Sequence, residues 1–172
     1  MNDQTAIRNV TVSNTSDQGG VAILVHGVVT VEDVVANARG TGVGTSYHDY
    51  GAIFAENAGT FLTVRDVVAH AETLSDGHDF GDALAISAFR GAIADVSDVK
   101  AFAGGGAYAV GLSADYDVSS IHIRNSYVEV SNTVGGRAIE GQNGSTVTNT
   151  VVWSTDTAVW SVDTIIGSEI HG

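Results

Sequence analysis

Two copies of one short motif carry the residues most able to do chemistry. Residues 47–51 (YHDYG) and 77–81 (GHDFG) share the pattern His-Asp-aromatic-Gly, thirty residues apart. If equivalent segments of the chain stack, the two histidines lie together and so do the two aspartates. Two imidazoles and two carboxylates could bind zinc, manganese or calcium, or act as a general acid and base. The motif therefore predicts metal-ligating or catalytic roles for His48, Asp49, His78 and Asp79.

The same motif also has a purely structural interpretation. After an internal duplication, the aromatic residue of each copy would cover a loop, the glycine would make a turn, and His and Asp would form a local hydrogen bond. Both interpretations stay open at the level of sequence.

Aromatic residues form a second group of candidates. Indole and phenol rings pack on the apolar face of a sugar ring and also present a polar group. The predicted substrate-binding residues are Tyr47, Tyr127, Trp153, Trp160 and Glu140. We assign Tyr127 and Trp153 to equivalent positions of successive repeats. The alternative is that loops or an oligomer interface cover these rings.

A repeated corner indicates which elements must position these residues. Asp or Asn recurs two positions after a branched aliphatic residue, at positions 9, 33, 66, 98, 125 and 149, with intervals of 24, 33, 32, 27 and 24. After the corner, alternate residues are small, as in Val67, Ala69 and Ala71. Alternation by two indicates strands with one buried face.

A second series of apolar residues precedes each corner. Its assigned members are Ile23, Ile53, Leu84, Tyr108, Ile139 and Val159. Glu140 sets the orientation, because a lone carboxylate faces outward and so places Ile139 inward. No segment shows the 3.6-residue apolar stripe of a helix, and equivalent strands lie a whole repeat apart, which indicates parallel stacking.

The repeats GVVTVED (27–33) and GTFLTVRD (59–66) resemble those of right-handed parallel β-helices in the pectate-lyase-like superfamily. The resemblance covers nearly the whole chain. It implies one all-β domain over 1–172, a right-handed parallel β-helix (solenoid) of about six rungs. Two corner insertions are expected, at Arg39–Gly51 and Glu72–Asp82.

The resemblance leaves activity open, because that superfamily includes lyases, hydrolases, epimerases, adhesins and inert scaffolds. The leading hypothesis is a structural module that binds carbohydrate or a protein partner. The alternative is a polysaccharide lyase, an epimerase or a cyclising isomerase that uses the His-Asp loops with a divalent cation (Ca, Zn or Mn). Since a lyase of this superfamily uses Lys or Arg as its base, Arg90 is a further catalytic candidate.

Charge and composition exclude several partners. Seven basic and twenty acidic residues give 7 − 20 = −13, so nucleic acid and anionic lipid are repelled. No apolar run reaches the roughly 20 residues of a membrane helix, so membrane insertion is not expected. Asp33, Asp66 and Asp98 would stack at the corner, either capping turns in water or lining a column of cations.

The two ends of such a coil would expose unpaired backbone groups. We expect another chain, such as a second copy in a homo-oligomer, to cover them, or the chain to be one piece of a longer protein. The first ten residues lack a signal peptide. A location outside the cell or at its surface is expected if a leader has been removed.

Overall fold

The computed structural model describes residues 5–17, 19–40, 48–73, 81–105, 108–115, 119–131, 135–142 and 144–172. For His48, Asp49, Gly81 and Asp115 it gives the strand position and not the side chain. Within these ranges all regular secondary structure is β-strand, and every pair of neighbouring strands is parallel. The predicted all-β class is confirmed.

The larger sheet has 12 strands and consists of two halves that share its long first strands. The shared strands are β1 (Thr5–Ser16) and β3 (Val28–Gly40). One half continues through β5 (Phe61–Arg65), β8 (Ile93–Ser97), β11 (Ser120–Arg124), β14 (Thr146–Thr148) and β17 (Thr164–Ile166). The other continues through β6 (Val68–Thr73), β9 (Lys100–Gly104), β12 (Tyr127–Ser131), β15 (Val151–Ser154) and β18 (Glu169–His171).

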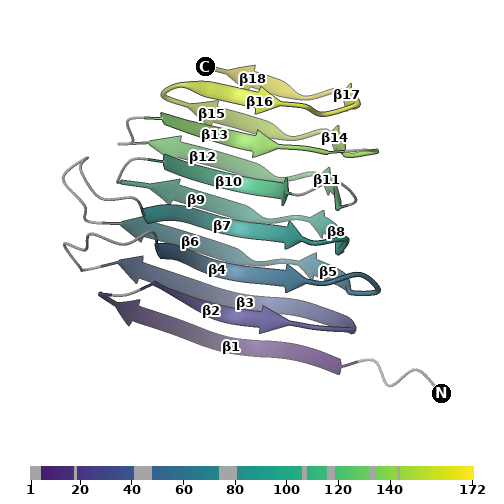
Figure 1. Cartoon of the computed structure of the whole chain (residues 1–172). Helices are drawn as coiled ribbons and strands as arrows, with labels where there is room; N and C mark the ends of the chain where they lie inside the picture. The colour runs from purple at the N-terminus through teal and green to yellow at the C-terminus, as the bar shows by residue number, and fades with distance from the viewer. Residues whose placement is uncertain are drawn as a thin grey trace.

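The smaller sheet has six strands. They are β2 (Gly20–Val25), β4 (His48–Glu56), β7 (Gly81–Phe89), β10 (Tyr108–Asp115), β13 (Gly135–Glu140) and β16 (Thr157–Trp160). After each of these strands the chain passes through one half of the larger sheet and then the other. Figure 1 shows the strands stacked in chain order from β1, at the N-terminal end, to β18.

A column of left-handed residues joins the two halves of the larger sheet. The predicted corner residues Asn9, Asp33, Asp66, Asp98, Asn125 and Asn149 all have positive φ angles, from 47° to 56°. Asp and Asn adopt this conformation more readily than other residues with a Cβ, because their short polar side chains bond locally. The corner positions are therefore confirmed, and Gly167 (φ 61°) continues the column.

The residue after each corner changes character along the stack. After Asn9 it is the exposed Val10, and after the three aspartate corners it is a buried valine (Val34, Val67 and Val99). In the later corners it is Ser126, Thr150 or Ser168. Each hydroxyl donates to a carbonyl two residues back and accepts a backbone N–H from the preceding corner. The later corners thus satisfy their polar groups through side chains.

The core is built from columns of inward side chains in register across the stack. One column runs through Ile7, Val31, Val64, Val96, Ile123, Val147 and Ile165. Val31, Val64 and Val96 are completely buried. At the C-terminal edge strands, β17 and β18, the columns end on exposed side chains, and Ile165 and Ile170 are 46% and 40% exposed. The homo-oligomer that would cover the ends stays a prediction.

The predicted register of the smaller sheet is wrong by two residues at Leu84 and by four at Tyr108. Ile53 pairs with Ile86, not Leu84, and Ile86 pairs with Leu112, so Tyr108 is not in this column. The cause is a break in alternation: adjacent Ala85 and Ile86 both lie in the main core, whereas Leu84 belongs to a small outer cluster with Phe54 and Val110.

The two expected insertions are shorter than predicted. β3 and β6 continue to Gly40 and Thr73, and β4 and β7 already begin at His48 and Gly81. The remaining residues of both insertions, 41–47 and 74–80, lie outside the described ranges. Within the described residues, no helix is long and apolar enough to cross a membrane.

Candidate functional site

The duplicated His-Asp motif lies only partly within the described structure. Tyr47, His78 and Asp79 lie outside it, and His48 and Asp49 are the first two residues of β4. Along the strands His48 pairs with Gly81 and Asp49 with Asp82. The strand register is therefore offset by 33 residues, whereas the motif repeats after thirty. Metal binding and catalysis by this motif stay predictions.

Tyr50, the aromatic residue of the first motif, is 5% exposed. Its ring lies against the backbone of Gly40 at the end of β3, where an added Cβ would come within 2.7 Å of two ring atoms. A larger residue at position 40 would therefore displace the ring. Tyr50 therefore packs on the end of β3, and the covering of a loop by this ring stays a prediction, because residues 41–47 lie outside the described ranges.

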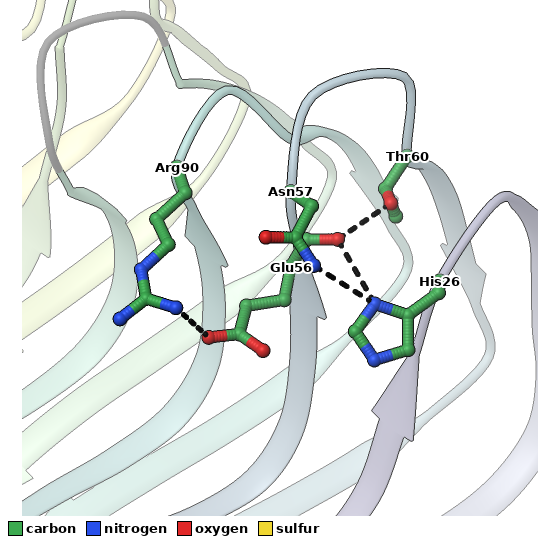
Figure 2. Close-up of polar contacts among 5 residues, drawn as sticks. All are labelled: His26, Glu56, Asn57, Thr60 and Arg90. Atoms are coloured by element: carbon green, nitrogen blue, oxygen red, sulfur yellow. Dashed lines mark hydrogen bonds and ion pairs between the residues drawn. The ribbon is translucent and has the colours of Figure 1, made fainter.

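Arg90, the candidate lyase base, lies in a turn after β7 with φ 52°. Its Nη1 is 3.1 Å from Glu56 Oε1, and Figure 2 shows this ion pair beside a turn that contains Asn57 and Thr60. Thr60 Oγ1 donates to the Glu56 carbonyl at 2.6 Å. The guanidinium is exposed and paired with a carboxylate, which is the usual state of a surface arginine.

The described residues contain no group of three or more His, Asp or Glu side chains arranged to hold a metal ion. Asp33, Asp66 and Asp98, the corner carboxylates, are exposed. Their exposure agrees with side chains that extend into water, and the capping of turns by these carboxylates stays a prediction.

The outer face of β9, β12, β15 and β18 gathers aromatic rings. Phe102 and Tyr127 lie 5.9 Å apart between ring centroids, and Trp153 stacks on His171 at 4.0 Å with an interplanar angle of 11°. Trp153 is 47% exposed. Trp153 therefore presents part of its indole to solvent.

Trp153 and Tyr127 are not at equivalent positions of their strands. Tyr127 pairs with Val151, and Trp153 pairs with Glu129. The assignment from sequence was wrong because Tyr127 comes two residues after its corner and Trp153 four residues after its own. The correction places a carboxylate directly beside the indole.

These side chains border a hollow of about 220 Å³, which we call the Trp153 groove. Its lining residues are Tyr127, Glu129, Val130, Ser131, Trp153, Ser154 and Thr155. Because β15 lies between β12 and β18, His171 covers the indole from one side and the groove residues of β12 lie on the other. The groove thus combines an exposed ring with hydroxyls and one carboxylate.

Glu129 is held in place by its neighbour Tyr127. The Tyr127 hydroxyl donates to Glu129 Oε2 at 2.8 Å. This hydrogen bond, together with partial burial and the carboxylate charge, raises the pKa of Tyr127. Tyr127 therefore keeps its proton at neutral pH and acts as a donor to Glu129.

Trp160 lies in a different environment on the smaller sheet. The Arg137 guanidinium lies 4.4 Å from the centroid of its ring, and Arg137 also forms an ion pair with Glu140. The second Glu140 oxygen accepts a hydrogen bond from Tyr108 at 2.9 Å. We call Tyr108, Arg137, Glu140 and Trp160 the Trp160 cluster.

Burial is the main reason that the pKa of Tyr108 is raised, and the hydrogen bond to Glu140 adds to it. Both carboxylate oxygens of Glu140 have donors, and the cation lies between carboxylate and indole. The cluster is internally satisfied, which is typical of a structural network.

Sequence reasoning missed Arg137, Tyr108 and Ser131. The spacing of Arg137 and Glu140, three residues apart, was an available signal for the ion pair. The contacts of Tyr108 with Glu140 and of Trp160 with Arg137 join different strands, so they depend on the strand register. Comparison of the chain with family models, with curated proteins and with solved structures found no match.

Proposed function

We propose that the chain is a right-handed parallel β-helix of about six rungs that acts as a saccharide-binding module. The parallel pairing of all strands and the regular succession of the three strand stacks support the β-helix interpretation. The observation that carries the binding function is the Trp153 groove, where an indole that is 47% exposed lies beside Glu129 and several hydroxyls.

The chemistry of the groove matches that of a sugar. A pyranose ring has C–H groups on its faces and hydroxyls around its edge. The indole of Trp153 offers a flat apolar surface, and Glu129, Ser131 and Thr155 supply polar groups at its border. At about 220 Å³ the groove is smaller than the roughly 300–1,000 Å³ of drug-sized pockets, so it suits one or two rings of an open chain.

The net charge of −13 supports this choice over nucleic acid and anionic lipid, which such a surface repels. The enzymatic alternative depends on His48, Asp49, His78 and Asp79 and stays a prediction. A protein partner also stays a prediction, as does a location outside the cell.

Calorimetric titration with a panel of tetrasaccharides tests the proposal. The panel contains neutral, N-acetylated, amino and uronic sugars. We expect at least one member to bind wild type, and Trp153→Ala to weaken that binding more than about tenfold, as for a central aromatic contact. Trp160→Ala is the matched control and should retain binding.

Circular dichroism of both variants shows whether they are folded. If no member of the panel binds wild type, or if Trp153→Ala binds as tightly as wild type, the proposed function is wrong.

A further inference from the structure

We propose that the Trp153 groove selects sugars that carry an ammonium group, and that Glu129 is the residue that recognises it. This inference rests on the proposed saccharide-binding function and names the class of ligand. The glutamates of the chain provide the evidence.

The chain has six glutamates, all of them within the described residues. Five form an ion pair with an arginine or a histidine: Glu32, Glu56, Glu72, Glu140 and Glu169. Among the described residues Glu129 alone has no such cationic partner. It is also the glutamate that lines the groove.

Glu129 is nevertheless a positioned group. Its Oε2 accepts a hydrogen bond from the Tyr127 hydroxyl at 2.8 Å, which orients the carboxylate and, among the described residues, leaves Oε1 for another donor. Lys100 lies opposite Tyr127 on β9, but within the described structure it forms no ion pair with Glu129. A half-buried carboxylate without a counterion favours a cationic donor from outside the chain.

The neighbouring indole favours the same ligand. Trp153 on β15 pairs with Glu129 on the adjacent strand β12, and the two backbones lie about 4.8 Å apart. A 2-amino-2-deoxy sugar stacked on Trp153 would hold its ammonium close to Glu129, and the ring face of tryptophan itself attracts cations. A uronic sugar would instead bring a second carboxylate to Glu129, which is unfavourable.

The test compares four tetramers by calorimetry: fully deacetylated chitotetraose, its N-acetylated form, cellotetraose and tetragalacturonic acid. At about pH 6 the amine is protonated and carboxylates are ionised. We expect the deacetylated tetramer to bind about fivefold to tenfold more tightly than cellotetraose, and tetragalacturonic acid not to bind.

Glu129→Gln should reduce the affinity for the deacetylated tetramer to that for cellotetraose and leave cellotetraose unchanged. Glu72→Gln is the matched control, because Glu72 lies in the same half of the sheet, is paired with Arg39 and changes the net charge equally. This control should keep the preference for the amino sugar.

Three results separate the possible failures. If cellotetraose binds through Trp153 and the deacetylated tetramer binds no more tightly, the inference is overturned and the proposed function stands. If Glu129→Gln and Glu72→Gln lose equal affinity for the deacetylated tetramer, the inference is also overturned. Equal losses would show that the ligand responds only to the net charge of the chain. If none of the tetramers binds, both proposals fail.

Discussion

The two tryptophans of the chain are almost equally exposed, at 47% for Trp153 and 52% for Trp160, yet their surroundings differ. Glu140 beside Trp160 receives donors on both oxygens, from Arg137 and Tyr108. Glu129 beside Trp153 receives one donor, from Tyr127. Exposure alone therefore does not distinguish the two rings, and the proposal that Trp153 binds a ligand depends on the polar groups beside it.

The difference does not originate in the pairing of carboxylate and ring, because each glutamate pairs with a tryptophan on the next strand. Arg137 and Glu140 belong to one strand, β13, and Trp160 pairs with Glu140 from the next, so cation, carboxylate and ring meet within two strands. In the Trp153 groove, Trp153 pairs with Glu129 in the same way, but β12, the strand of Glu129, contributes no arginine. Among the described residues, the carboxylate of the Trp160 cluster therefore has a cationic partner and that of the Trp153 groove has none.

The largest expected effect comes from the core that supports both clusters. Val64→Asp would bury an unpaired charge at a position with no exposed surface, and should destabilise the fold by about 4 kcal/mol or more. Val68→Asp, the same substitution at a residue that is 36% exposed, should cost less than about 1 kcal/mol. Thermal melting followed by circular dichroism measures both. Equal melting of Val64→Asp and wild type would show that the core register is wrong.

The corner and the core columns were predictable because their signals are local. Asp33, Asp66 and Asp98 recur where the backbone must be left-handed, and few other residues tolerate that conformation. Alternation of small residues then placed Ala69 and Ala71 inside, where both are fully buried.

The proposed binding residues were less predictable because their contacts depend on side-chain directions. Glu129 and Trp153 both lie four residues after their corners, so the repeat itself pairs them. The hydrogen bond from Tyr127 to Glu129 and the stacking of Trp153 on His171 depend on rotamers that the sequence pattern does not give. Two adjacent inward residues, Ala85 and Ile86, likewise shifted the register of the smaller sheet in a way that strict alternation does not anticipate.

A pair of carboxylate substitutions should separate the structural cluster from the groove. Glu140→Gln weakens the ion pair with Arg137 and the hydrogen bond from Tyr108, and should lower the free energy of unfolding by about 1–2 kcal/mol. Glu129→Gln weakens one hydrogen bond at an open site and should cost less than about 0.5 kcal/mol. Urea denaturation at neutral pH measures both. If Glu129→Gln lowers the free energy of unfolding more than Glu140→Gln does, then Glu129 and not Glu140 belongs to the structural network.

A smaller effect should appear at high pH. Because the pKa of Tyr108 is raised above its ordinary value of 10.0, the folded chain keeps a proton that the unfolded chain has lost. The resulting stabilisation is complete below about pH 10 and declines as the pH rises above it. The free energy of unfolding, measured by denaturation at about pH 9 and pH 11, should therefore fall more steeply for wild type than for Tyr108→Phe.

Tyr127→Phe is the comparison variant, since the pKa of Tyr127 is raised chiefly by its hydrogen bond to Glu129. The free energy of unfolding of Tyr127→Phe should decline with pH more nearly as it does in wild type. The same slope for wild type and Tyr108→Phe would mean that Tyr108 is not held by the Trp160 cluster.

The central claim, that Trp153 and not Trp160 contacts the ligand, can be measured directly because the chain has only two tryptophans. In Trp160→Phe all indole fluorescence comes from Trp153, and in Trp153→Phe all of it comes from Trp160. Each variant is titrated with the tightest-binding tetrasaccharide of the panel. We predict a saturable change in intensity and a shift to shorter wavelength in Trp160→Phe, and a flat response in Trp153→Phe. A saturable change in Trp153→Phe with none in Trp160→Phe would contradict the account.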